Sequence, residues 1–416
     1  MAERAVSAFG VLVIMLLSFA LCPPDRRRLV KPRTVGGGLL LLIVFALIVL
    51  RTPAKRLFLL GNDAVDRLLA FSRDGASFLF GRLTTDPTSF GFILAFQVLP
   101  TILFFSALMS LLYHLRVMPL IIESLGRLLM RLLGTSGAES FSTVADIFVG
   151  QTEAPLAIKP YLAKMSVSEL NACMVAGFAT TAGGVLAAYV AMLSHAVPGI
   201  AGHLIACSVM SAPASLVIAK LMLPEQADRD FEREASINIP KASENLLDAI
   251  AQGTGDGIRL AVNVGGMLVV FLALTAMFNA ALGYLSGALF GRAVSLELIF
   301  GWLFAPLAWL MGVPNQDVLK VGQLLGQKTV LNEFVAYSHM AEMLNRDPEW
   351  LSERGRTIAA YALCGFANFG SIGIQIGGYA GLAPERRGDI SRLAFKAMVG
   401  GLLATCLVAC VAGVML

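Results

Sequence analysis

Eight mainly apolar stretches, most of them long enough to cross a lipid bilayer, constrain the fold of this chain more than any other feature. Hydrophobic residues make up 57% of the chain and charged residues 14%, a composition that excludes a soluble globular domain. The short alternating segments of a membrane barrel are not seen in the sequence. We therefore predict an all-α polytopic membrane protein, with eight transmembrane helices over residues 5–21, 35–50, 90–113, 169–193, 200–223, 257–285, 359–378 and 397–416.

The Lys and Arg residues of short loops predict the orientation, because such loops stay in the cytoplasm. Basic residues concentrate at 25–33 and 385–392, and we place the mixed-charge segment 224–244 on the same side. Eight spans then put both termini outside. Arg4 before an apolar run ending near Cys22 also suits a cleaved signal peptide. Residues 19–22 lack the small residue expected before a cleavage site, so we expect a retained helix.

The remaining composition gives no sign of a cofactor or of a nucleic-acid partner. The six cysteines fall mainly within apolar stretches without paired spacing, which favours small buried side chains. The four histidines form no metal-binding motif. The net charge of +4 belongs to the basic loops. We expect the lipid bilayer as the main partner and no nucleic acid.

Several segments do not read as simple spans. Residues 55–82, 125–133 and 242–250 are amphipathic, which suits helices on a membrane surface or helices packed on protein. Residues 138–162 and 303–337 instead have polar centres between apolar arms, with GQTE at 150–153 and GQK at 326–328 followed by NE at 332–333. Irregular backbone at membrane depth is tolerated only where protein or a watery cavity receives it. We therefore predict two re-entrant hairpins that face one cavity.

Each predicted hairpin precedes an apolar helix interrupted by a small polar cluster, and the two clusters echo one another. GFATTAG at 177–183 returns as GFANFGS at 365–371. A duplicated unit with an acid and a broken helix is typical of a secondary transporter, whose site lies between two repeats. We predict N-terminal transmembrane helices and an interfacial helix over 1–89, and a first inverted repeat over 90–223. A cytoplasmic linker with an interfacial helix follows over 224–256, and the second inverted repeat covers 257–416.

Three acids stand in these polar centres: Asp146, Glu153 and Glu333. Each would cost about 2.5–3.5 kcal/mol near the bilayer centre, so acids retained there mark solute paths. In the alternative interpretation all three lie in loops at headgroup level, where charge is well solvated. The concentration of acids at two symmetry-related places favours a function in transport.

The motifs also resemble a known family. Residues 134–155, 332–337 and 364–372 are similar to those of the concentrative nucleoside transporters, and the likeness runs from about Ser77 to the C-terminus. The eight-span length resembles the bacterial branch. The resemblance implies a homotrimer in the bacterial inner (plasma) membrane and cation-coupled nucleoside symport by an elevator-type mechanism.

The resemblance also implies roles for individual residues. Those expected to contact the nucleobase are Gln151, Thr152 and Glu153, with Val185 beside them. Those expected to hold the ribose hydroxyls are Glu333, Asn368 and Ser371. Amide and carboxylate groups match the donors and acceptors of a nucleoside, and bonds to a charged group are the stronger ones. For Asn368 and Ser371, packing between helices is the alternative.

The coupling ion is less constrained than the substrate. The family's sodium site maps onto Asp146, Val149, Thr180 and Thr181, and sodium-coupled relatives usually have Asn at the position of Asp146. A carboxylate there suits sodium, but a desolvated carboxyl also has a raised pKa and can carry a proton. The rest of the hairpin resembles the sodium-coupled branch, so we favour sodium slightly.

Two further questions stay open at this point. Gly150 and Gly184 flank the expected base pocket, which suggests room for purines as well as pyrimidines; close helix packing is the alternative. Other function classes are an intramembrane enzyme that uses Glu153 or Glu333, and a passive channel. No acidic pair or basic phosphate cradle of such an enzyme is seen, and paired hairpins with opposed acids favour an alternating site over a channel.

Overall fold

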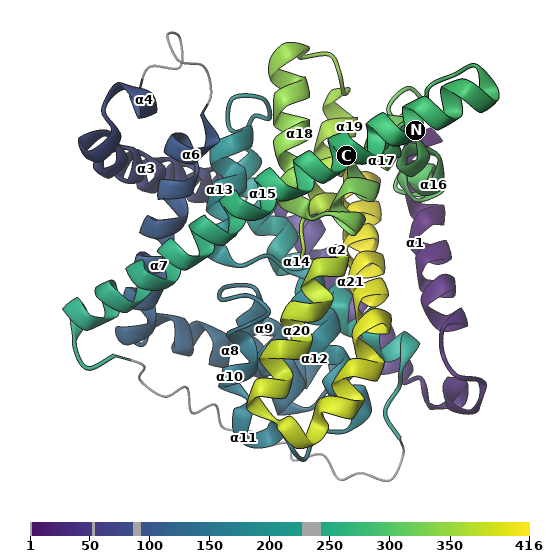
Figure 1. Ribbon diagram of the computed structural model, residues 1–416. Helices are drawn as coiled ribbons and strands as arrows, with labels where there is room; N and C mark the ends of the chain where they lie inside the picture. The colour runs from purple at the N-terminus through teal and green to yellow at the C-terminus, as the bar shows by residue number, and fades with distance from the viewer. Residues whose placement is uncertain (1, 52–54, 86–92, 227–242) are drawn as a thin grey trace.

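The computed structural model describes residues 2–51, 55–85, 93–226 and 243–416, and within these ranges the regular structure is helical, without a strand (Figure 1). An all-α membrane protein is therefore confirmed. Seven of the described helices or helix pairs are long and apolar enough to cross a membrane: Ala2–Ala20, Pro32–Arg51, Leu94–His114, Val167–Leu193, Ile200–Met222, Leu246–Leu289 and Pro384–Met415. The predicted span 359–378 is not among them, because it falls on two shorter helices, Glu353–Leu363 and Phe369–Leu382, that residues 364–368 separate.

The described N-terminal part consists of three long helices and three short ones. Its elements are α1 (Ala2–Ala20), the short η1 (Pro24–Leu29), α2 (Pro32–Arg51), α3 (Lys55–Phe80), α4 (Arg82–Thr85) and α6 (Leu94–Gln97). The amphipathic segment 55–82 is thus helical, as predicted. Residues 90–92, at the start of the predicted third span, lie outside the described residues.

The rest of the chain contains the same series of elements twice: a long helix, a second helix, a hairpin, a broken helix and a final long helix. The first series is α7 (Leu99–His114), α8 (Val117–Leu133), α9 (Gly137–Asp146) with the short α10 (Ala154–Ala157) and α11 (Lys159–Leu162), α12 (Val167–Ala179), α13 (Gly183–Leu193) and α14 (Ile200–Met222). The second is α15 (Leu246–Phe290), α16 (Leu296–Leu310), α17 (Val318–Val330), α18 (Glu333–Arg346), α19 (Glu353–Leu363), α20 (Phe369–Leu382), η2 (Pro384–Arg386) and α21 (Arg387–Met415).

Two predicted boundaries were wrong. The second hairpin consists of α17 and α18 and not of residues 303–337, because residues 303–310 belong to the separate helix α16. The segment 242–250 is not a separate surface helix: from Leu246 onward it forms the first turns of the continuous α15, and Ala242 lies outside the described residues. Sequence periodicity alone did not separate a short amphipathic helix from the start of a long one.

The two echoing motifs are out of register in the structure. Gly177 lies inside α12, whereas Gly365 lies in the break between α19 and α20 with φ of +119°. Both helices are interrupted, as predicted, but at different points of the repeated sequence. The helical starts after the two breaks, at Gly183 and Phe369, are the structurally matching positions.

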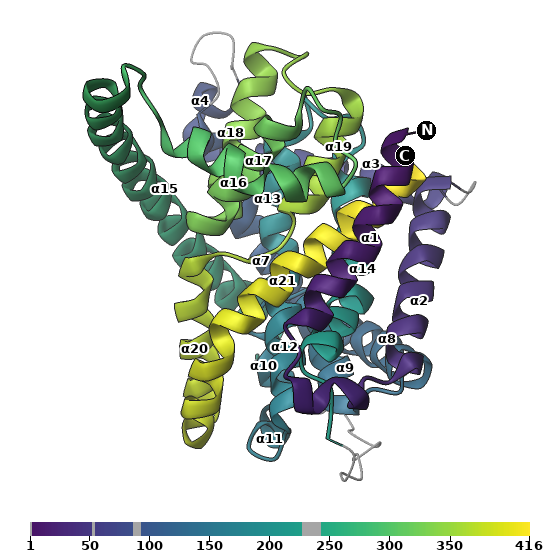
Figure 2. The ribbon, with the colours of Figure 1, turned by 90° about the vertical axis from the view of Figure 1, so that its right-hand side faces the viewer.

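Contacts between loops define the two ends of the molecule. At one end, Ser166 Oγ donates to Glu225 Oε2 (2.7 Å) and Arg386 Nη1 donates to the carbonyl of Met165 (2.6 Å), which joins the loops after the first hairpin, after α14 and before α21. At the other end, the Arg4 guanidinium donates to the carbonyl of Leu416 (2.6 Å). Figure 2 shows α11 and the α20–α21 loop at one end, and α18 and both termini at the other.

The core lies in the helices that end each repeat. In the most apolar 18-residue windows, 89% of the residues are buried for Ile200–Met222 but 12% for Leu246–Leu289. The long α15 crosses the face of the molecule (Figure 1) and contacts α7 closely, since a Cβ on Gly257 would lie 2.8 Å from the Cα of Leu103. The remaining apolar surface of α15 points outward, as a membrane-exposed helix requires.

Candidate functional site

The breaks and hairpin turns place polar side chains next to helix ends in the protein interior. Asn368 begins α20 by accepting a hydrogen bond from the Ser371 backbone N–H through Oδ1 (2.8 Å). Asn332 begins α18 in the same way, accepting from the Val335 N–H (2.8 Å). Such N-caps satisfy donors that a helix leaves free. They also fix the first turn of each helix, and Glu333 and Ser371 lie in those turns.

Glu333 is buried, and both of its carboxylate oxygens accept a hydrogen bond from the protein. The Tyr189 hydroxyl donates to Oε1 (2.9 Å), and the Asn368 amide donates to Oε2 (2.9 Å). The side chain is 5% exposed. Three elements therefore meet at this acid: α13 of the first repeat, the second hairpin and the break before α20.

Gln151 connects the first hairpin to α20. Its Nε2 donates to Ser371 Oγ (3.2 Å), and Gln375 Nε2 donates to Gln151 Oε1 (3.1 Å) and to the carbonyl of Met174 (3.1 Å). Because Ser371 is also bonded to Asn368, the bonds join four predicted binding residues into one continuous chain. That chain runs through Gln151, Ser371, Asn368 and Glu333.

The other predicted binding residues are not part of this chain. Thr152 and Glu153 are exposed at the tip of the first hairpin, where Thr152 is hydrogen-bonded to the Glu153 side chain. Val185 is buried in the first turn of α13. Exposed polar groups at a tip and a buried apolar group behind it are compatible with contacts to a polar solute.

Sequence reasoning missed two residues of this network, Tyr189 and Gln375. Both are 0% exposed and bond directly to a predicted binding residue. Each lies four positions after another predicted residue, Tyr189 after Val185 and Gln375 after Ser371. Residues four apart share a helix face, so this spacing was the signal that could have found them.

Asp146 is the last residue of α9, and it is fully buried. Neither carboxylate oxygen has a hydrogen-bond partner within the described structure. The side chain lies against α12, since a Cβ built on Gly177 would be 3.5 Å from Oδ1. A buried carboxylate without a partner is costly unless it is neutralised. The environment therefore fits either a bound cation or a proton on Asp146.

The remaining residues of the predicted ion site lie near the first break. Thr180 and Thr181 are buried just after α12, and the hydroxyl of Thr180 donates to the carbonyl of Ala176 (2.8 Å). Val149 is half-buried in the hairpin turn. The turn contacts the break directly, because the Gly183 N–H donates to the carbonyl of Phe148 (3.0 Å). These contacts put oxygen-bearing groups of both segments in one region.

Glycine occurs at positions 150 and 184 of the expected base pocket for different structural reasons. Gly150 has φ of +90°, and a Cβ there would lie 2.8 Å from the Cβ of Ala182. The turn itself thus requires glycine at this position. A Cβ on Gly184 would make only ordinary contacts, the nearest to Ser106 Oγ at 3.6 Å. Only Gly184 leaves space that a side chain could have filled.

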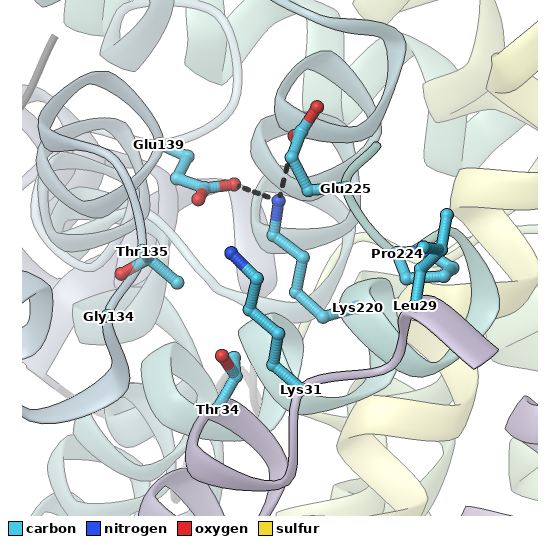
Figure 3. A pocket seen from close by; sticks show the side chains of 9 residues that line it. All are labelled: Leu29, Lys31, Thr34, Gly134, Thr135, Glu139, Lys220, Pro224 and Glu225. Atoms are coloured by element: carbon cyan, nitrogen blue, oxygen red, sulfur yellow. Dashed lines mark ion pairs between the residues drawn. The ribbon is translucent and has the colours of Figure 1, made fainter. Parts of the chain in front are cut away.

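A separate polar pocket is lined in part by Leu29 and Lys31 of the basic segment 25–33 (Figure 3). At its centre, Lys220 of α14 forms ion pairs with Glu139 (2.6 Å) and Glu225 (3.7 Å). Glu139 also closes the capping box that begins α9, accepting from the Ser136 N–H (2.9 Å). The pocket therefore marks the attachment of the first hairpin to α14. The residues lining it are Leu29, Lys31, Thr34, Gly134, Thr135, Glu139, Lys220, Pro224 and Glu225.

Comparison with known proteins assigns the chain to a family. The family models described as the C-terminus and the N-terminus of a Na+ dependent nucleoside transporter match residues 203–413 and 9–83, and one described as nucleoside recognition matches 95–196. An uncharacterized transporter of Haemophilus influenzae is 43% identical over 404 residues, which cover 96% of this chain and 95% of that protein. Sodium/nucleoside cotransporter 1 of Rattus norvegicus is 39% identical over 427 residues, covering 99% of this chain and 64% of the relative.

Solved structures agree over the whole chain. CNTnw in an inward-facing substrate-bound state matches with a TM-score of 0.91 and 40% identity, over 99% of this chain and 98% of that one. A double variant of CNTnw in an outward-facing state matches with a TM-score of 0.93 and 40% identity, over 100% and 98%. This chain belongs to the Na+ dependent (concentrative) nucleoside transporter family, whose members are membrane transporters and not enzymes.

Proposed function

We propose that this protein takes up nucleosides by alternating access and couples their entry to a cation gradient, with sodium as the cation. The observation that carries the proposal is the hydrogen-bonded chain from Gln151 through Ser371 and Asn368 to Glu333. It joins the first hairpin to the second hairpin and to the second broken helix, so a solute bound there contacts both repeats. Amide, hydroxyl and carboxylate groups match the polar edge of a base and the hydroxyls of a ribose.

Within this proposal, Gln151, Thr152 and Glu153 bind the base beside Val185, and Glu333, Asn368 and Ser371 bind the ribose. The exposed Thr152 and Glu153 have room to meet a ligand. The open space at Gly184 supports a pocket that accepts purines as well as pyrimidines. Uridine and adenosine should then compete for one saturable uptake.

The cation is proposed to bind Asp146 together with oxygen atoms of Val149, Thr180 and Thr181. Support comes from the unpartnered carboxylate and from its position against the helix that ends at the first break. Carboxylate, hydroxyl and carbonyl oxygens are the ligands that hard cations prefer. A proton on Asp146 is the second candidate, since it also removes the cost of a buried charge.

The same proposal includes a homotrimer in a bacterial inner membrane, elevator-type motion and both termini in the periplasm. The exposed apolar surface of α15 supports a membrane or subunit contact. The basic loops and the termini lie at opposite ends, which supports the predicted orientation.

The test is accumulation of unmodified uridine in sealed proteoliposomes under an imposed sodium gradient or an imposed proton gradient, applied one at a time. We expect accumulation above equilibrium with sodium alone. Accumulation with protons and no sodium would replace sodium by a proton on Asp146. Equilibration without accumulation under either gradient would point to a passive channel and end the proposal of coupling.

A further inference from the structure

Lys328 of α17 is a fully buried lysine held by neutral oxygen atoms. Its Nζ donates to the carbonyl of Ala362 (2.8 Å), in the last turn of α19, and to Thr405 Oγ1 of α21 (3.1 Å). None of the ion pairs found among the described residues includes Lys328. The C-terminal end of a helix carries partial negative charge, which suits an ammonium group.

The place of this ammonium in the second repeat corresponds to the place of Asp146 in the first. α17 and α9 are the first arms of the two hairpins, and α19 and α12 are the first halves of the two broken helices. Asp146 lies at the end of α9 against α12, and Lys328 lies near the end of α17 against the end of α19. Among the described residues, one repeat thus has a carboxylate without a positive partner, and the other has a positive charge fixed at a helix end.

The charge of Lys328 also acts on the binding site. Glu333 lies five positions further along the chain, and the described side chains that donate to its two oxygens are the neutral Tyr189 and Asn368. Among the described residues, the positive charge of Lys328 attracts the Glu333 carboxylate. A methionine would fill the volume of the lysine stem, so packing alone does not explain a buried ammonium, which is costly to desolvate.

We propose that Lys328 is a tethered cation of the second repeat, which permanently supplies the positive charge that the coupling cation supplies to the first repeat only when bound. The inference rests on the proposed cation site at Asp146. It follows that the second repeat requires no dissolved cation, and that one cation suffices for each nucleoside carried.

The experiment removes the positive charge of Lys328 by substitution and then supplies a dissolved cation in its place. Uridine binding to purified Lys328→Gln and Lys328→Met is measured calorimetrically over a range of sodium and methylammonium concentrations, with sodium-dependent uptake measured in parallel. Gln keeps a donor for Ala362 and provides a second folded variant if Met disturbs packing. At sodium that saturates the wild type, we expect uridine affinity to fall at least about tenfold, because Glu333 loses the attraction of a nearby positive charge.

Two results would identify the role of the charge. Methylammonium or high sodium should restore most of the lost affinity, and the Hill coefficient for sodium should rise from about one toward about two. Thr405→Val is the matched control: it removes one bond to the ammonium but keeps the charge, so its Hill coefficient should stay at the wild-type value. Lys328→Arg should behave like the control.

Three outcomes would overturn the inference. Wild-type affinity and an unchanged sodium curve in both folded variants would show that the charge is not needed. Weak binding that no cation restores, with the Hill coefficient unchanged, would reduce Lys328 to a packing residue. A rise of the Hill coefficient in the Thr405→Val control as well would also reduce Lys328 to a packing residue. Failure of the proposed sodium coupling is detected separately, as wild-type uptake that does not depend on sodium, and methylammonium rescue of uridine binding still tests Lys328 in that case.

Discussion

The two hairpins carry an acid at matching points, yet the structure treats the two acids in opposite ways. Glu153 begins the short α10 at the exposed tip of the first hairpin, whereas Glu333 begins α18 and is 5% exposed. The hydroxyl of Tyr189, in α13, donates a hydrogen bond to Glu333. The charged neighbour of the first acid is Asp256 of α15, a residue of like sign.

This difference indicates that the two halves of the site bind a ligand in different ways. Glu333 is preorganised, because protein donors already fix both oxygens, and less ordering is needed when a ligand binds. Glu153 is exposed, and no side chain of the second repeat bonds to it among the described residues. The first hairpin is anchored at its start by the ion pair between Glu139 and Lys220. In the second hairpin, Lys328 donates to the carbonyl of Ala362 at the end of α19.

The largest effect on stability is expected when the ion pair between Lys220 and Glu139, at the start of the first hairpin, is removed. Lys220→Met should lower the free energy of unfolding by about 3–5 kcal/mol, because it leaves Glu139 buried without its partner. Thermal unfolding in detergent measures it. The double variant with Glu139→Gln removes both charges and should regain much of that loss. No recovery in the double variant would show that the ion pair does not hold the hairpin.

Glu333→Gln keeps the size of the side chain but removes the charged acceptor. Uridine binding should weaken by about 1.5–3 kcal/mol, and analogues without ribose hydroxyls should lose less. Competition binding with uridine and its deoxy analogues gives both values. Glu153→Gln is the matched control on the exposed acid and should affect both kinds of ligand alike. Equal losses for Glu333→Gln would make Glu333 a structural residue.

Asp146→Asn tests the proposed cation site. If Asp146 binds sodium, the change should lower sodium affinity by about tenfold or more, since it removes one unit of ligand charge, while sodium still drives uptake. If Asp146 is the proton carrier, the same change should abolish stimulation by an inward proton gradient. Uridine accumulation against sodium concentration and against imposed pH separates the two, and an unchanged dependence on both would exclude Asp146 from coupling.

Tyr189→Phe should have the smallest effect. It removes one neutral donor from Glu333 and leaves that oxygen open to a ligand hydroxyl, so uridine affinity should change by about 0.5–1.5 kcal/mol. Ligand-dependent thermal shifts suffice to measure it. Gln375→Leu is the companion variant for the first hairpin, because it frees Gln151 in the same way. A loss as large as that of Glu333→Gln would mean that Tyr189, and not the acid, organises the ribose side.

Much of the architecture followed from the sequence because it depends on local composition. Bilayer-length apolar stretches, glycine-containing polar centres and the duplicated acids predicted helices, hairpins and broken helices that the structure contains. Asn368 and Ser371 were expected to act together. The sequence placed the second hairpin wrongly, because the apolar residues 303–310 were counted as one of its arms although they belong to the separate and more apolar helix α16. It also matched Gly177 to Gly365, although only the latter lies in a break.

The sequence by itself determined that this chain is a duplicated membrane helix protein with acids in its hairpins. Only the tertiary structure decided which acid is buried, which stays open and what each one contacts. Tyr189 and Glu333 are 144 positions apart, and Gln151 and Ser371 are 220 apart. Periodicity relates only residues three or four positions apart on one helix. Partners from different repeats are set by how the helices pack. That packing also places Lys328 at the end of α19 and leaves Asp146 without a hydrogen-bond partner in the described part of the chain.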